Sequence, residues 1–303
     1  MTNLTGFVNI IKPTGMGSTD VVSKVKKILG TNKVGHLGTL DVPATGVLPI
    51  AIGKATKFFD YFLSKDKEYF ALVEFGIKTD TLDSFGEIVE KREDNITAEM
   101  INRILPKFIG EISQIPPKYS AIKINGKRAS DLARENIDFE IKPRNITIFD
   151  VKLMKSLGQN KFIFKVHCSA GTYIRTLFSD IAESLGTIST TSVIIRTKSG
   201  LFTTKNAITL EELEKNKQIL SISDIFCDFS KFEVNDYLAK KLINGVKINA
   251  IDLLANAKVD EKTFNNLKQA KKEFFITTNN EYIGMYKANN NYIENLIYLF
   301  ENR

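Results

Sequence analysis

The residues with the clearest potential for chemistry lie in one glycine-rich loop, Gly35-His-Leu-Gly-Thr-Leu-Asp-Val-Pro-Ala-Thr-Gly46. Its glycines can adopt left-handed backbone conformations or let a bulky ligand approach the chain closely, and its proline stiffens the turn. Asp41 is the acidic residue of this loop and, if the loop is an active site, its candidate catalytic group. Composition alone leaves a plain surface turn at least as plausible as an active site.

Two other kinds of site are poorly supported by the sequence. Gly46 to Ala55 looks like a phosphate-binding loop, but six residues separate its glycines instead of four, and Ala55 replaces the Ser or Thr that would hold magnesium. His36 and His167 are the only histidines, and His167 ends an apolar strand, where we expect it to be buried. We therefore expect no metal and no cofactor.

Composition and charge indicate an intracellular protein with a polyanionic partner. The 303 residues carry a formal charge of +7 and a pI near 9.1, which suits nucleic acid, although ordinary solvated charge would give the same numbers. Cys168 and Cys227 are too few for a disulfide framework. The N-terminus lacks the features of a secretory signal, and no apolar stretch approaches the roughly 18 residues of a membrane span. We expect a cytoplasmic protein without membrane contact.

The elements around the loop alternate between strand and helix patterns. A short apolar run, Gly6–Lys12, predicts a strand that Pro13 closes, and a helix is expected from Ser18 or Thr19 to a stop at Gly30. Further strands are predicted at Lys67–Phe75, Glu87–Val89, Ser120–Ile124, Ile146–Lys152 and Phe162–Cys168. Further helices are predicted at Thr97–Phe108, Ala129–Arg134, Thr172–Leu185 and Leu210–Asn216. The expected fold class is α+β, with a mixed, mostly antiparallel sheet and flanking helices.

A domain boundary is expected where the pattern weakens, near Ser223 to Lys231. Residues 1–228 would form the large domain. Residues 229–303 would form a small β-rich domain whose short strands are separated by turns such as Asn279-Asn280 and Asn289–Asn291.

The glycine-rich loop closely resembles the GHxGxLDPxATG signature of bacterial tRNA pseudouridine-55 synthases, the TruB-type family. Further blocks resemble that family in the same order: GFVNIIKPTGMGSTDVV, LPIAIGKATKF, IPPKYSAIKINGKRASDLAR, HCSAGTYIRTLFSDI and VIIRTKSGLF. Three residues depart from its pattern. Leu37 replaces a small or hydroxyl residue, Val42 a proline and Ser130 a tyrosine.

The resemblance implies the pseudouridine synthase fold, a small PUA-like RNA-binding domain at the C-terminus and a set of site residues. Asp41 matches the nucleophile, and Arg175 matches the partner arginine, whose planar fork should keep the carboxylate ionised. Tyr69 matches the tyrosine that stacks on the base, and Ile195 is aligned with an apolar residue near the same base. Without the resemblance, Arg175 would be read as an exposed helix arginine and Tyr69 as a core aromatic.

The implied reaction isomerises the T-loop uridine at position 55 of tRNA to pseudouridine, after the base turns out of the folded RNA. His36 matches a histidine that fills the vacated space, although it could simply hydrogen-bond within the loop. Candidate RNA contacts are Lys12, Lys123, Lys127 and Arg128, with a solvated charged loop as the alternative for the last three. The partner would be tRNA, through its T-arm, elbow and acceptor stem, and the protein would be a monomer. A catalytically silent RNA-binding protein and an enzyme guided by a separate RNA with protein partners are the other hypotheses.

Overall fold

The computed structural model describes residues 4–289 and 292–300, which form two compact units. The larger unit comprises Val8–Ile50 and Asp60–Gln218. The smaller unit comprises Ala51–Phe59 and the described parts of residues 1–7 and 219–303. The sequence places the domain boundary at 228/229, and this boundary stays a prediction.

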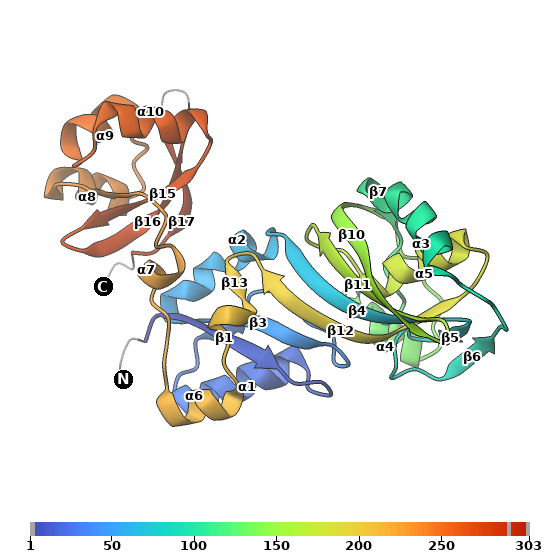
Figure 1. The fold of residues 1–303 in the computed structure, drawn as a ribbon. Coiled ribbons are helices and arrows are strands. Elements are labelled where there is room, and N and C mark those ends of the chain that lie inside the picture. The colour runs from blue at the N-terminus through green and yellow to red at the C-terminus, as the bar shows by residue number, and fades with distance from the viewer. Residues whose placement is uncertain (1–3, 290–291, 301–303) are drawn as a thin grey trace. The chain divides into compact units, whose positions relative to one another are not determined.

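A long mixed sheet forms the frame of the larger unit (Figure 1). Its main path runs β1-β3-β12-β4-β11-β10-β7, with β2 on β3 and β13 on β12. These strands are β1 (Gly6–Lys12), β2 (Val34–His36), β3 (Thr45–Ile52), β4 (Lys67–Phe75), β7 (Gly110–Gln114), β10 (Arg144–Gly158), β11 (Lys161–Cys168), β12 (Ser189–Ser199) and β13 (Phe202–Thr203). From β12 to β7 every pairing is antiparallel, whereas β3 runs parallel to β12. The expected fold class is confirmed.

Helices and small hairpins surround this sheet. The helices are α1 (Ser18–Leu29), α2 (Phe59–Leu63), α3 (Ala98–Ile104), α4 (Ala129–Arg134), α5 (Ile174–Ser184) and α6 (Leu210–Asn216), and the 3-10 turns are η2 (Leu105–Phe108) and η3 (Thr204–Asn206). A further 3-10 turn, η1 (Gly53–Phe58), belongs to the smaller unit. The hairpins pair β5 (Ile77–Thr79) with β6 (Ile88–Lys91), and β8 (Lys123–Ile124) with β9 (Lys127–Arg128). None of the helices in the described residues is both long enough and apolar enough to cross a bilayer.

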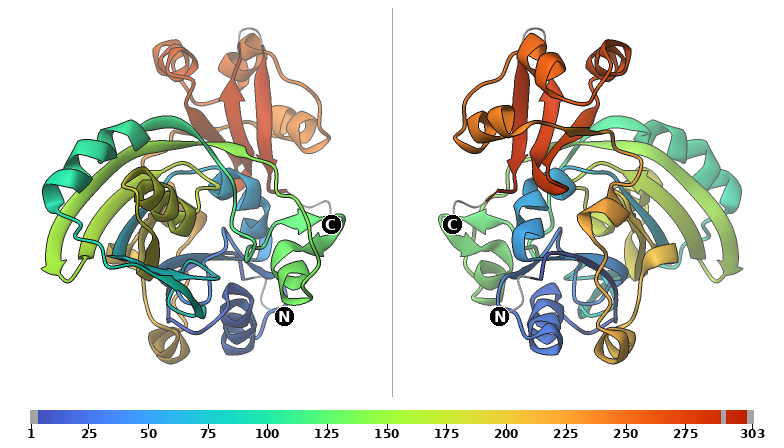
Figure 2. Two further views of the ribbon diagram at one scale, coloured as in Figure 1. Left: turned by 90° about the vertical axis from the view of Figure 1, so that its right-hand side faces the viewer. Right: turned by 90° about the vertical axis from the view of Figure 1, so that its left-hand side faces the viewer.

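Helix α5 packs on the sheet with an apolar stripe and lies within the curve of the strands (Figure 2). Ile174, Leu177, Phe178 and Ile181 recur at helical spacing and are buried. The strands alternate in the matching way, since β4 buries Tyr69, Ala71 and Val73 on one face. This packing brings the first turn of α5 close to the middle of the sheet.

Most predicted elements of the larger unit are confirmed, some with the same bounds. The predicted strands Gly6–Lys12 and Lys67–Phe75 coincide with β1 and β4, and Gly30 ends α1 in a left-handed conformation with φ 64°. The predicted helix Thr97–Phe108 is divided into α3 and η2, because Pro106 cannot continue an α-helix. Strand β12 lies at the centre of the sheet and was not among the predicted strands.

The smaller unit contains a four-stranded sheet in the order β14-β15-β16-β17, as expected for a β-rich tail. These strands are β14 (Lys231–Glu233), β15 (Glu273–Thr278), β16 (Glu281–Ala288) and β17 (Ile293–Tyr298). Asn279 and Asn280, with φ of 50° and 63°, form the predicted turn between β15 and β16. The predicted turn at Asn289–Asn291 includes residues 290–291, which lie outside the described residues.

The smaller unit also contains helices that the sequence pattern did not predict. They are α7 (Ile222–Ile225), α8 (Asp236–Ile243), α9 (Ala250–Asn256) and α10 (Glu261–Gln269). Asn235, Asn249 and Asp260 cap the last three, each accepting a hydrogen bond from a backbone N–H in the first turn. The tail was expected to consist of short strands separated by turns, but Asn and Asp side chains also favour the first positions of helices.

Candidate active site

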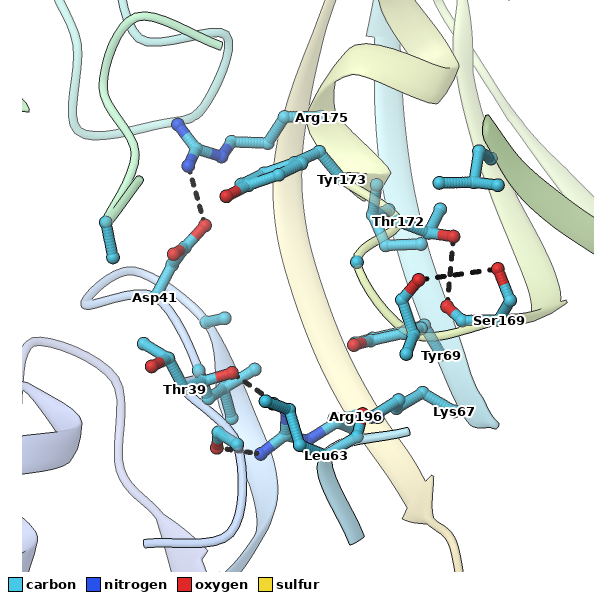
Figure 3. Close-up of a pocket in the computed structure, with 18 of the residues that line it drawn as sticks. Thr39, Asp41, Leu63, Lys67, Tyr69, Ser169, Thr172, Tyr173, Arg175 and Arg196 are labelled. Atoms are coloured by element: carbon cyan, nitrogen blue, oxygen red, sulfur yellow. Dashed lines mark hydrogen bonds and ion pairs between the residues drawn. The ribbon is translucent and has the colours of Figure 1, made fainter. Parts of the chain in front are cut away.

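A cavity of about 650 Å³ lies over the sheet of the larger unit, at the point where the Asp41 loop faces the start of α5 (Figure 3). Its walls come from the loop, from β4 and β12, and from the segment that leads into α5. The residues that line it include Gly38, Thr39, Leu40, Asp41, Lys67, Tyr69, Lys123, Ser169, Thr172, Tyr173, Arg175, Ile194 and Arg196. A cavity of this size can enclose a nucleotide.

Asp41 points toward Arg175, and the two form an ion pair in the cavity wall (Figure 3). Arg175 Nη2 donates to Asp41 Oδ2 over 2.7 Å. The arginine side chain is 4% exposed and the Asp41 side chain 36% exposed. The carboxylate is therefore fixed on one side by a buried cation and remains accessible to a ligand on the other.

Arg175 is itself held by a network that the sequence did not predict. Its Nη2 also donates to the Tyr119 carbonyl over 3.0 Å, and its Nη1 donates to the Thr81 carbonyl over 2.8 Å. Nη1 also lies 3.3 Å from Oδ2 of Asp83, a buried second carboxylate. The guanidinium thus bridges two carboxylates, instead of making both of its contacts with Asp41.

The Asp41 loop is tied to the segment before α1. Ser18 Oγ donates to the Leu40 carbonyl and accepts from the Leu40 N–H, over 2.8 and 2.9 Å. The Val42 carbonyl accepts from the Gly15 N–H over 2.8 Å and from Lys12 Nζ over 3.3 Å. Because Val42 is bound through its carbonyl, the replacement of the family's proline leaves these contacts available. Leu37, which also departs from the family's pattern, is buried in the core.

Lys12 has a different role from the RNA contact expected of it. Its side chain is completely buried, and Nζ also donates to the carbonyls of Pro13 and Met16, over 2.8 and 2.7 Å. Desolvation lowers its pKa from 10.5 to about 8, against an opposing effect of Asp41. With its N–H groups directed at three carbonyls, Lys12 positions the loop and does not face a ligand.

A second buried arginine, Arg196 on β12, holds the loop from the sheet side. Its Nε donates to the Val47 carbonyl over 2.7 Å, Nη1 to the Thr39 carbonyl over 2.9 Å and Nη2 to the Gly38 carbonyl over 3.3 Å. Gly46 has φ +107°, and a Cβ there would come within 2.2 Å of the Arg196 carbonyl oxygen. Only glycine allows the loop to approach β12 this closely.

Tyr69 lies on the cavity floor as the sequence predicted, 8% exposed and opposite Arg196 in the β4–β12 ladder. Burial raises the pKa of its hydroxyl to about 12. The phenol is therefore protonated at neutral pH. Its ring provides a flat apolar surface in the cavity.

Ile195 does not lie in the cavity, contrary to the sequence prediction. Successive side chains of a strand point to opposite faces, and it is Ile194 and Arg196 that line the cavity while Ile195 is 37% exposed. Ile194 is thus the apolar residue beside Tyr69.

The comparisons with known proteins agree with this geometry. Residues 26–174 match the model of the TruB family pseudouridylate synthase N-terminal domain. The tRNA pseudouridine synthase B of Clostridioides difficile (strain 630) is 45% identical over 260 residues, covering 82% of this chain and 86% of the relative. The tRNA pseudouridine synthase B of Clostridium tetani (strain Massachusetts / E88) is 40% identical over 283 residues, covering 90% of this chain and 98% of the relative. This chain belongs to the TruB family of pseudouridylate synthases.

Solved structures support the same assignment at the level of the fold. A crystal structure of a Cbf5-Nop10-Gar1 complex contains a chain that matches 97% of this one with a TM-score of 0.70 at 25% identity, covering 85% of that chain. A structure of an H/ACA RNP bound to a substrate RNA containing 2′-deoxyuridine contains a chain that matches with a TM-score of 0.69 at 22% identity. The match covers 98% of this chain and 85% of that chain.

The remaining predicted residues of this TruB-family chain lie at varying distances from the cavity. Lys123 lines it, whereas Lys127 and Arg128 are exposed on the β8–β9 hairpin and are not among the lining residues. His36 is on β2, with a buried Nδ1 that has no hydrogen-bond partner in the described part of the chain, and desolvation lowers the pKa of the imidazole. His167 is only partly buried, contrary to expectation, because it lies on the less buried face of β11, between the buried Val166 and Cys168. Its Nε2 lies 2.6 Å from Asp66 Oδ2.

The cavity residues that sequence reasoning missed include Tyr173, Arg196 and Lys67. Tyr173 precedes Arg175 by two residues in the GTYIR block, and its ring lies beside the ion pair (Figure 3). Lys67 is 6% exposed, and desolvation lowers its pKa to about 8. The signal available for Lys67 was its position two residues before Tyr69, which places both on one face of a strand.

Proposed function

We propose that this chain isomerises the T-loop uridine at position 55 of tRNA to pseudouridine, with Asp41 as the catalytic carboxylate. The observation that carries the proposal is the Asp41–Arg175 pair in the wall of a cavity large enough for a nucleotide. Membership of the TruB family supports the reaction class, and the names of the relatives identify their substrate as tRNA.

The proposed reaction breaks the bond between ribose C1′ and uracil N1 and joins C1′ to C5, while C5 loses its proton and N1 gains one. Asp41 provides the nucleophile that forms a transient covalent bond and then leaves. The fixed Arg175 guanidinium stabilises the carboxylate in its reactive, charged form before and after the adduct.

The base must leave the RNA stack to reach this cavity, at a cost of roughly a few kcal/mol for unstacking. Tyr69 and Ile194 provide the surfaces on which the extruded uracil can pack. Because the Tyr69 hydroxyl has a pKa of about 12, we assign its main role to ring packing. His36 would support the RNA next to the vacated position.

Contacts with the rest of the tRNA are proposed for exposed basic groups. Lys123, Lys127 and Arg128 lie on one hairpin, of which Lys123 lines the cavity, and they suit the phosphates of the T-arm and elbow. The domain formed by residues 229–303 is proposed to contact the acceptor stem. We further propose that the protein acts in the cytoplasm as a monomer, without an obligatory protein partner.

The test uses purified protein and a transcribed tRNA that contains uridine tritiated at C5. Joining C1′ to C5 must release that tritium to water, so the proposal expects release without any added protein or guide RNA. Nucleoside analysis should identify pseudouridine at position 55. Absence of release from a tRNA that the protein binds would contradict the proposal and favour a catalytically silent RNA-binding protein.

A further inference from the structure

Arg196 is a buried cation that makes no ion pair with any carboxylate among the described residues. It is 1% exposed and belongs to the largest fully buried side chains of the protein. Burial of a charge is costly unless strong hydrogen bonds replace its hydration. The three backbone carbonyls that it binds fill this role, so their positions and that of the guanidinium depend on each other.

These three carbonyls lie on both sides of Asp41. Gly38 and Thr39 precede the aspartate, and Val47 follows it at the start of β3. The planar guanidinium therefore joins the two ends of the loop that carries the nucleophile. The parallel pairing of Arg196 with Gly46 adds a close backbone contact at the second end.

The same arginine is also linked to the cavity floor. Arg196 pairs with Tyr69 in the register of β12 and β4, and both side chains line the cavity. One residue thus binds the backbone around the carboxylate through its side chain and is paired in the sheet with Tyr69, on whose ring the base is proposed to pack. Figure 3 shows the Arg196 guanidinium directed at the loop near Thr39, away from Asp41 itself.

We propose that Arg196 is a positioning residue that sets the distance between the Asp41 carboxylate and the Tyr69 ring by holding the carbonyls of Gly38, Thr39 and Val47. The proposal rests on the proposed isomerase function. It divides the work between two arginines. Arg175 binds the carboxylate, and Arg196 binds the backbone that presents it.

Lysine cannot reproduce this arrangement, because one ammonium group replaces three N–H directions fixed in a plane. In Arg196→Lys the loop should shift by a fraction of an ångström to an ångström. Misplacement on that scale costs about 100-fold in the rate of a chemical step. Affinity for tRNA should change less than about threefold, since the RNA-facing groups are unaltered.

The experiment compares wild type, Arg196→Lys, Arg196→Met and the control Arg92→Lys, whose arginine is exposed and paired with Glu90. Four quantities are measured for each folded variant: the single-turnover rate of tritium release, the Kd for tRNA, the midpoint of thermal unfolding, and amide hydrogen exchange of residues 38–47 in the free protein. Arg196→Met keeps the bulk of the side chain without its charge. If it fails to fold, Arg196→Lys alone decides.

The proposal expects faster exchange confined to residues 38–47 in Arg196→Lys, together with the loss of rate at nearly unchanged Kd. Unchanged exchange would overturn it, even if the wild type proved inactive and the isomerase function failed. A normal rate in an active series would also overturn it. Parallel loss of thermal stability, tRNA affinity and rate would reduce Arg196 to a general structural residue and would overturn the positioning role.

Discussion

Replacement of Arg175 by lysine separates chemistry from RNA binding. In the structure, Arg175 Nη2 donates a hydrogen bond to Asp41 over 2.7 Å. Nη1 donates to the Thr81 carbonyl over 2.8 Å and lies 3.3 Å from Asp83 Oδ2. A lysine Nζ can occupy the position of only one of these two nitrogen atoms. If it stays with Asp83, the carboxylate of Asp41 loses its charged hydrogen bond.

A hydrogen bond to a charged group contributes about 1.5–3 kcal/mol. Loss of one such bond in the transition state corresponds to a rate about 10- to 150-fold lower. Because Arg175 is 4% exposed, bulk water cannot replace the lost donor at full strength. The Kd for tRNA should remain within about threefold, since a buried side chain makes little contact with RNA phosphates.

The assay is single-turnover tritium release with enzyme in excess, together with filter binding of the same tRNA. Arg103→Lys, an exposed arginine on α3, is the matched control and should retain both values. Equal losses of rate and affinity in Arg175→Lys would refute the reasoning, because they would assign Arg175 to gripping RNA.

Three further perturbations test other parts of the structure. Ile194→Ala should lower the single-turnover rate about tenfold through loss of cavity packing. Ile195→Ala, on the opposite face of β12, should change the rate less than about twofold. A larger loss of rate in Ile195→Ala than in Ile194→Ala would contradict the placement of Ile194 in the cavity. Gly46→Ala should lower the free energy of unfolding by more than about 2 kcal/mol in urea titration, because the added Cβ would lie 2.2 Å from the Arg196 carbonyl oxygen. An unchanged free energy of unfolding would refute the close contact between the loop and β12. Desolvation lowers the pKa of Lys67 to about 8 in the folded protein, from 10.5 ordinarily. Between these two pH values the unfolded chain binds more protons than the folded protein, so the free energy of unfolding should rise with pH across that window. In Lys67→Met this rise should be smaller, and a pH dependence identical to that of the wild type would count against the shifted pKa.

The sequence predicts much of the frame, because the elements next to the site have strong local signals. The strand Lys67–Phe75 alternates clearly, and Gly30 ends the helix before it as predicted. The predicted cap is wrong, because Gly17 is the N-cap and neither Ser18 nor Thr19 takes that position. The pairing of Asp41 with Arg175 was reached through the family resemblance. Their separation of 134 residues leaves no local pattern that could join them.

The errors have identifiable physical causes. Val193, Ile194 and Ile195 are all apolar, so alternation gives no phase for β12, and the wrong residue was assigned to the cavity. Arg196 was overlooked because arginine is normally a surface residue. The helices that Asn235 and Asn249 cap lie in a tail that was expected to consist of short strands.

The most direct test of the catalytic role of Asp41 compares wild type with Asp41→Asn, using single-turnover tritium release from the tritiated tRNA. The substitution keeps the shape of the side chain and removes its negative charge. We expect no release above the background without enzyme, while tRNA binding persists and the exposed control Asp60→Asn remains fully active. Release by Asp41→Asn at the wild-type rate would contradict the account.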